Sequence, residues 1–116
     1  GRTILIDEDY FPIFQALASC SPAWYFQIID TFARAGLKYG LSKDSAVEIA
    51  AQAMAGAATL LLAEREAGTI PAQLIDRVTS PGGTTIAGLL AAEEGGLSNA
   101  LVGAVDASIH ADSHLG

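Results

Sequence analysis

One stretch of this sequence is rich in residues that restrict or free the backbone, and it reads Val78-Thr79-Ser80-Pro81-Gly82-Gly83-Thr84-Thr85. Pro81 fixes its own φ angle and favours an extended conformation for the residue before it. The two glycines that follow can adopt positive φ angles and allow another group to approach the backbone closely. Because threonine is a good N-cap, we expect one of the two final threonines to cap a helix over residues 86–93. The stretch therefore predicts a tight loop that leads directly into a helix.

The start of that helix offers a seat for a small anion. The first N–H groups of a helix have no partner inside the helix, and the positive end of the helix dipole lies at the same place. A phosphate or a carboxylate fits such a site without a metal, a base or a nucleophile. Glycine loops before helices are also ordinary connectors between two helices. The residues alone leave both interpretations open.

The composition indicates one domain without a nucleic-acid partner. The chain has 116 residues and a net charge of −7, and this length suits a single domain with its own core. A nucleic-acid interface needs a basic patch, and the few basic residues of this chain are scattered. They are Arg2, Arg34, Lys38, Lys43, Arg65 and Arg77.

The cysteine content and the first residues of the chain indicate a cytoplasmic protein. The single cysteine, Cys20, excludes a disulfide within the chain and fits a reducing cytoplasm. The first residues turn acidic too early for a signal peptide. The chain begins with Gly1 instead of methionine, and we expect it to be a segment of a longer protein.

Helix start and stop signals recur along the chain and predict an all-α fold of five or six helices. A short extended segment over residues 3–6 precedes a first helix that Asp7 caps. Ser21 as N-cap and Pro22 at the first helical position start a second helix, which Gly40 ends. The later helices are predicted to start at Ser42, at Pro71, after the 78–85 stretch and at Ser98.

The helix after Ser42 is apolar over most of its circumference between residues 46 and 63. Such a helix is typical of a central, buried position. Its most apolar window, residues 53–63, is shorter than the about 20 residues that a membrane span requires, so we expect a buried helix and no membrane partner. Long helices with two apolar sides are more than a small monomer can cover. We therefore expect another subunit or another domain to cover one face.

The remaining reactive residues do not predict a catalytic or metal site. Cys20 has no histidine in its local sequence, and we expect it to be inert. Asp106, His110 and His114 share one helix face at a spacing that fits a divalent metal, but a solvated face is the simpler interpretation. We expect no metal. The acidic run at residues 7–9 is explained by the dipole of the helix that it precedes.

The region from residue 78 to residue 89 closely resembles the signature of pyrroline-5-carboxylate reductase, the last enzyme of proline synthesis. It reads Val78-Thr79-Ser80-Pro81-Gly82-Gly83-Thr84-Thr85-Ile86-Ala87-Gly88-Leu89. The resemblance covers most of the chain, with further matches in the expected order and spacing at Glu8, Phe11, Ala35-Gly36-Leu37, Gly40-Leu41, Gln52, Gly56-Ala57-Ala58, Glu93 and Gly95-Gly96. A Ser-Pro-Gly-Gly-Thr-Thr run in this order is far more specific than a lone glycine pattern.

The resemblance implies a fold, a reaction and a partner. Residues 1–116 would form the helical C-terminal domain, which dimerises by interlocking helices, with assembly beyond the dimer left open. An N-terminal Rossmann domain, absent from this chain, would bind NAD or NADP, so no cofactor is expected on this fragment alone. The full enzyme reduces 1-pyrroline-5-carboxylate to L-proline in the cytoplasm, and the isolated fragment is expected to be inactive.

The resemblance also implies the site. The family's loop binds the carboxylate of the substrate, and the matching residues here are Val78, Ser80, Pro81, Gly82, Gly83, Thr84 and Thr85. A threonine hydroxyl near the ring nitrogen is implied as the catalytic contact, and Thr85 is the residue that we assign to it.

One run departs from the family. Where the family has Ser-Gly-Ser-Gly-Pro-Ala-Tyr near the nicotinamide, this chain has Ala18-Ser19-Cys20-Ser21-Pro22-Ala23-Trp24. Both glycines and the central serine are replaced, and serine does not adopt positive φ freely. We therefore expect Cys20, Ser21 and Pro22 to form a cofactor-proximal loop of altered shape. The departure favours a second hypothesis, a non-catalytic helical dimerisation module of a reductase-like protein whose reaction is lost or changed.

Overall fold

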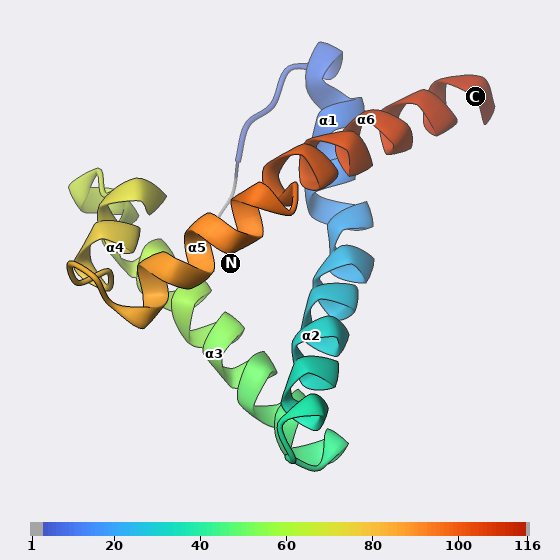
Figure 1. The fold of residues 1–116 in the computed structure, drawn as a ribbon. Helices are drawn as coiled ribbons and strands as arrows, with labels where there is room; N and C mark the ends of the chain where they lie inside the picture. Colours follow the sequence, from blue (N-terminus) through green and yellow to red (C-terminus); the bar gives the residue numbers. More distant parts are fainter. Residues whose placement is uncertain (1–3, 116) are drawn as a thin grey trace. The chain divides into compact units, whose positions relative to one another are not determined.

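The computed structural model describes residues 4–115, and all regular structure within them is helical (Figure 1). This confirms the predicted all-α fold. The α-helices are α1 (Phe11–Gln15), α2 (Ser21–Lys38), α3 (Lys43–Glu64), α4 (Pro71–Arg77), α5 (Thr84–Glu94) and α6 (Leu97–Leu115). Three short helical segments join them: the 3₁₀ turns η1 (Glu8–Tyr10) and η3 (Arg65–Ala67), and the π-helical turn η2 (Ala16–Cys20).

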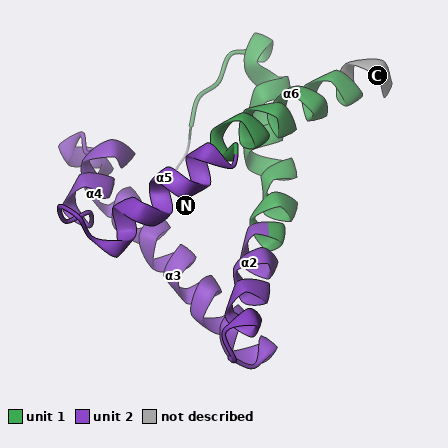
Figure 2. Ribbon diagram, in the orientation of Figure 1, with its two compact units in different colours: residues 1–27, 96–116 green, residues 28–95 purple. Residues whose placement is uncertain are grey.

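Two compact units divide the chain (Figure 2). The first consists of residues 1–27 and 96–116, and in it α6 packs against α1 and η2. The second consists of residues 28–95 and holds most of α2 together with α3, α4 and α5. The 78–85 loop lies wholly in the second unit.

The turn between α2 and α3 is confirmed as predicted. Gly40 has a φ angle of 101°, in the left-handed region that glycine adopts freely. The Leu41 N–H donates to the Gly36 carbonyl at 3.0 Å, which is the long bond of a Schellman motif. Ser42 then caps α3, because its hydroxyl oxygen accepts from the Ser45 N–H at 3.2 Å. Local residues alone account for this turn.

The run before α2 differs from the prediction. α2 begins at Ser21, but Ser21 is not an N-cap: its backbone is helical, with φ −61° and ψ −28°, and its hydroxyl donates to the Leu17 carbonyl at 2.5 Å. The chain stays helical through η2 instead of breaking. Pro22 supplies the reason, because a proline inside a continuous helix lacks the N–H that bonds four residues back and crowds that carbonyl. A π turn just before the proline accommodates both effects.

The other boundaries are partly confirmed. α4 begins at Pro71 as predicted, after Gly68 reverses the chain with a φ angle of 82°. The first helical turn follows Asp7, but the Asp7 side chain makes no capping hydrogen bond. α6 begins at Leu97, so Ser98 lies inside the helix and is not its N-cap. Residues 4–6 form no strand, and the remainder of the predicted extended segment lies outside the described residues.

The burial of α3 is the largest difference from the prediction. Of this helix only Ala46 is buried, and Ile49 and Leu60 are exposed. By length and composition alone, the segment Lys43–Ala67, which includes η3, could cross a membrane, so the prediction that this helix is too short for a span is wrong. In its most apolar window 6% is buried. The prediction of a central, buried helix is therefore wrong for the single chain. The physical reason is that the other described elements of the second unit do not cover the apolar circumference of so long a helix.

Candidate functional site

The 78–85 loop turns at Pro81 and Gly82. The Gly83 N–H donates to the Ser80 carbonyl at 3.0 Å and closes a four-residue turn. Gly82 has a φ angle of 69°, and proline followed by a glycine with positive φ is the arrangement of a type II turn. A Cβ atom on Gly83 would lie 3.2 Å from the Ser80 carbonyl oxygen and would overlap the Ser80 hydroxyl oxygen. One glycine is therefore required for its φ angle, and the other for close approach.

α5 begins immediately after this turn. Its N-cap is Gly83 and its first residue is Thr84, so the prediction that a threonine caps this helix is wrong. The turn leaves Gly83 with φ −82° and ψ 177°, which is the extended backbone of an N-cap residue. Both threonines therefore follow the N-cap position, where a capping side chain would have to be.

The first N–H groups of α5 are available for a ligand. Among the described residues none accepts a hydrogen bond from the N–H of Thr84, Thr85 or Ile86, and the first helical bond runs from the Ala87 N–H to the Gly83 carbonyl at 3.4 Å. No side chain of residues 4–115 caps this end, and both threonines are exposed. Free N–H donors at the positive end of a helix dipole suit one carboxylate or phosphate.

A polar cluster that the sequence did not reveal lies just before this loop. Glu64 Oε2 accepts from Arg77 Nη1 at 2.8 Å, and Glu64 Oε1 accepts from the Thr69 hydroxyl at 3.1 Å. The hydrogen bond from Arg77, and then that from Thr69, hold the pKa of the Glu64 carboxyl below its usual value. Glu64 and Arg77 are 13 positions apart. No helix or strand periodicity links two such positions across a turn and a second helix, so only the fold reveals the pair.

The predicted cofactor-proximal residues belong to the other unit. The prediction that they form a loop is wrong, because Cys20 ends η2 while Ser21 and Pro22 lie in the first turn of α2. Cys20 is half-buried and Ser21 is buried. All three fall within residues 1–27, whereas the 78–85 loop falls within residues 28–95.

The predicted helix face with metal-binding spacing lies on α6. Asp106 and His110 are exposed there, and the side chain of His114 is outside the described part of the chain. In the described part, no three His, Cys, Asp or Glu side chains are grouped so that they could hold a metal ion.

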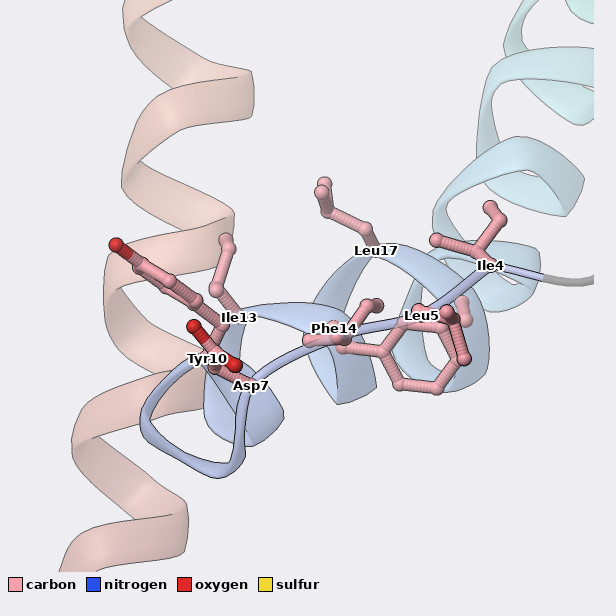
Figure 3. A pocket seen from close by; sticks show the side chains of 9 residues that line it. Ile4, Leu5, Asp7, Tyr10, Ile13, Phe14 and Leu17 are labelled. Atoms are coloured by element: carbon pink, nitrogen blue, oxygen red, sulfur yellow. The ribbon is translucent and has the colours of Figure 1, made fainter.

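Apolar hollows lie elsewhere on the molecule. In the first unit, the N-terminal segment and α1 line a hollow of about 720 Å³, with Leu5, Phe14 and Leu17 around it (Figure 3). In the second unit, α2 and α3 line a groove of about 430 Å³ that includes Phe32 and Met54. Neither hollow includes a residue of the 78–85 loop. Both offer apolar surface and no group of catalytic side chains.

Comparison with known proteins identifies the domain. The family model for pyrroline-5-carboxylate reductase dimerisation matches residues 8–115. The chain is 45% identical over 105 residues to the pyrroline-5-carboxylate reductase of Treponema pallidum (strain Nichols), which is 90% of this chain and 39% of that protein. It is 40% identical over 103 residues to pyrroline-5-carboxylate reductase 2 of Homo sapiens, which is 89% of this chain and 31% of that protein.

Solved structures agree. The crystal structure of 1-pyrroline-5-carboxylate reductase from Streptococcus pyogenes matches with a TM-score of 0.85 at 40% identity, over 95% of this chain and 41% of that one. Pyrroline carboxylate reductase of Plasmodium falciparum, with NADP bound, matches with a TM-score of 0.86 at 28% identity, over 96% of this chain and 41% of that one. The chain thus spans less than half the length of each of these relatives. Because sequence and fold agree over nearly its whole length, the chain belongs to the pyrroline-5-carboxylate reductase dimerisation family.

Proposed function

We propose that this chain is the dimerisation and substrate-binding part of a pyrroline-5-carboxylate reductase, which reduces 1-pyrroline-5-carboxylate to L-proline with NADH or NADPH. The observation that carries the proposal is the type II turn at residues 80–83, followed by three N–H groups that have no acceptor in the described part of the chain. Such a site suits a carboxylate, which the substrate has. The relatives bear the name of this reductase. The reaction itself is a property of the longer protein of which this chain is a part.

In this proposal the loop holds the substrate and does not reduce it. The substrate carboxylate accepts hydrogen bonds from the N–H groups at the start of α5, while the Thr85 hydroxyl lies at the ring nitrogen and donates a proton there as the ring is reduced. Apolar side chains at the turn form the wall beside the ring. The residues of this seat are Val78, Ser80, Pro81, Gly82, Gly83, Thr84 and Thr85.

The residues of this chain do not fit a nicotinamide dinucleotide by themselves. A Rossmann-type site needs a strand, a glycine-rich turn and a helix in succession. The described residues include no strand, and the sequence contains no Gly-x-Gly-x-x-Gly. When bound, the cofactor supplies the hydride; the proposal assigns its binding to an N-terminal domain of the longer protein, with Cys20, Ser21 and Pro22 near it. NAD and NADP both fit the proposal, and the Plasmodium falciparum relative binds NADP.

The reductase proposal is tested by assaying the full-length protein beside the isolated chain. We expect the full-length protein to oxidise NADPH or NADH only when 1-pyrroline-5-carboxylate is present, and to form L-proline. We expect residues 1–116 alone to show no turnover, because the proposal assigns cofactor binding to the N-terminal domain. If the full-length protein folds and binds the cofactor but forms no proline, the proposed reductase activity is refuted. That result would leave the non-catalytic dimerisation module, which the departure at residues 18–21 favours.

A second copy of the chain is the partner that we propose for the exposed face of α3. The groove between α2 and α3 is lined by apolar side chains, and Phe32 in it is 63% exposed. Uncovered apolar surface of this kind marks an interface with protein or membrane. The family to which the chain belongs is one of dimerisation domains, which favours a protein partner over a lipid bilayer. We propose a cytoplasmic homodimer with interlocking helices.

Replacing Ala53 with Glu is expected to weaken this dimer. Ala53 lines the groove, and a carboxylate there would be buried without a partner once the second copy covers it. We expect the dimer dissociation constant to rise at least about 30-fold, which corresponds to about 2 kcal/mol. Sedimentation velocity over a dilution series measures the constant and also detects assembly beyond the dimer.

Ser45→Glu is the matched control for this substitution. It adds the same charge to the first turn of α3, outside the residues that line the groove. A carboxylate is favourable at that end of a helix, so the dimer should persist. Equal dissociation constants for wild type and Ala53→Glu would show that the groove is not the interface.

A further inference from the structure

We propose that Glu64 and Arg77 are positioning residues. Their ion pair fixes the position of the 78–85 loop relative to the end of α3, and this position determines the affinity of the loop for its carboxylate substrate. The identity of the substrate rests on the function proposed above; the positioning role is additional to it. The seat at the start of α5 consists largely of backbone groups. The position of this site therefore depends on the preceding backbone, which is α4, and on the contacts that fix α4.

A single carboxylate ties both ends of α4 to the end of α3. Glu64, the last residue of α3, accepts from the Thr69 hydroxyl at 3.1 Å on the N-terminal side of α4. It also accepts from Arg77 Nη1 at 2.8 Å, and Arg77 is the last residue of α4. A helix of seven residues is about 10 Å long, so an arginine at its end can reach back to the end of α3.

The two ends of α4 are held differently. At the N-terminal end Thr69 is 7% exposed, its carbonyl accepts from Arg65 Nη1 at 2.5 Å, and its N–H donates to the Glu64 carbonyl at 3.3 Å. This end keeps several bonds if the carboxylate is lost. At the C-terminal end, the Thr79 hydroxyl donates to the Ile75 carbonyl at 2.7 Å, which is a bond within the α4 region itself. The tie from Arg77 to Glu64 therefore matters most on the side of the loop.

The solvent exposure of the Glu64–Arg77 pair indicates a local effect on the loop and not an effect on global stability. The Arg77 side chain is 55% exposed and that of Glu64 is 27% exposed. Ion pairs in contact with water contribute little to global stability and are weakened by salt. The hydrogen bond from Arg77 lowers the pKa of Glu64, so both partners are charged at neutral pH. Loss of the pair should leave the fold intact and release the loop locally.

The test uses the full-length protein with Glu64→Gln, Arg77→Gln and both together. We expect KM for 1-pyrroline-5-carboxylate to rise roughly fivefold in each single variant, while kcat stays within about twofold of wild type. The reason is that the loop keeps all its substrate-binding groups, and only their position is less well fixed. The double variant should resemble either single variant, since both changes remove one interaction. Added salt should raise the KM of wild type more than that of the variants.

Lys43→Gln is the matched control. It removes an ion pair of the same kind, Lys43 to Asp30 at 2.9 Å, at the opposite end of α3. Its KM should equal that of wild type. The inference is overturned if both single variants keep the wild-type KM, or if Lys43→Gln shows the same rise.

Amide hydrogen exchange over residues 78–83, where the N–H groups of Val78, Thr79 and Gly83 are hydrogen-bonded, provides a measurement that needs no turnover. Faster exchange in Glu64→Gln, but not in Lys43→Gln, supports the positioning role even if the wild type reduces no 1-pyrroline-5-carboxylate. In that event only the proposed reaction fails. Exchange that is unchanged in Glu64→Gln overturns the positioning role, whatever the activity of the wild type.

Discussion

Replacing Thr85 with Val is expected to lower kcat of the full-length protein roughly 100-fold or more, with a smaller change in KM. Val has nearly the shape of Thr and lacks only the hydroxyl that we assign to the ring nitrogen. Thr85 is the second residue of α5 and is exposed beside the free N–H groups. Its hydroxyl is thus near the proposed carboxylate seat. Steady-state kinetics with 1-pyrroline-5-carboxylate and NADPH measure both constants.

Thr85→Ser is the matched variant, because it keeps the hydroxyl and loses only the methyl group. Its kcat should stay within about tenfold of wild type, since the proton donor remains. Both variants should dimerise as wild type does. A Val variant with wild-type kcat would remove Thr85 from the reaction and would favour a role in assembly alone.

Replacing Gly83 with Ala is expected to lower kcat/KM roughly tenfold or more, because the Ser80 backbone must shift to admit the added Cβ and the rate depends steeply on the position of substrate-binding groups. The added Cβ would overlap the Ser80 hydroxyl oxygen and would lie 3.2 Å from the Ser80 carbonyl oxygen. The 3.0 Å bond between Gly83 and Ser80 closes the turn, so the two residues cannot separate without opening it. The carboxylate seat would move with the turn.

Gly103→Ala controls for the general effect of glycine substitution in this chain. Gly103 lies inside α6, and beyond its own chain neighbours and the nearby helix backbone no atom of the described residues lies within 4 Å of the Cβ that would be added. This variant should keep its kcat/KM and gain roughly 0.5–1 kcal/mol of stability in thermal unfolding. Wild-type kcat/KM in Gly83→Ala would contradict the requirement for close approach at the turn.

The features that could be predicted from the sequence are those governed by neighbouring residues. The left-handed Gly40, the Ser42 cap and the start of α4 at Pro71 each depend on a few consecutive positions. The turn at Pro81 and Gly82 belongs to the same class, because proline and glycine restrict or free the backbone in any context. The resemblance to the family rested on the same residues, and the comparisons confirmed it.

Two of the predictions that failed are cases in which two local rules competed. Ser21 followed by Pro22 has the pattern of a helix start, yet the chain was already helical and continued through a π turn. Two threonines after Gly83 favoured a threonine cap, yet the turn had already placed Gly83 in the extended conformation of an N-cap. Composition does not show which rule prevails, because the outcome depends on the conformation of the preceding segment.

The sequence by itself determined the helical class, the family and the turn that precedes α5, because these follow from backbone restrictions and from short-range order along the chain. Only the tertiary structure showed that α3 is left largely uncovered, since burial depends on whether other elements reach a helix and not on how apolar it is. Only the tertiary structure joined Glu64 to Arg77, because the fold brings together side chains that no sequence period relates. The 78–85 loop can therefore be recognised from its own residues, whereas the contact that we propose to hold it in place, the ion pair between the ends of α3 and α4, is seen only in the fold.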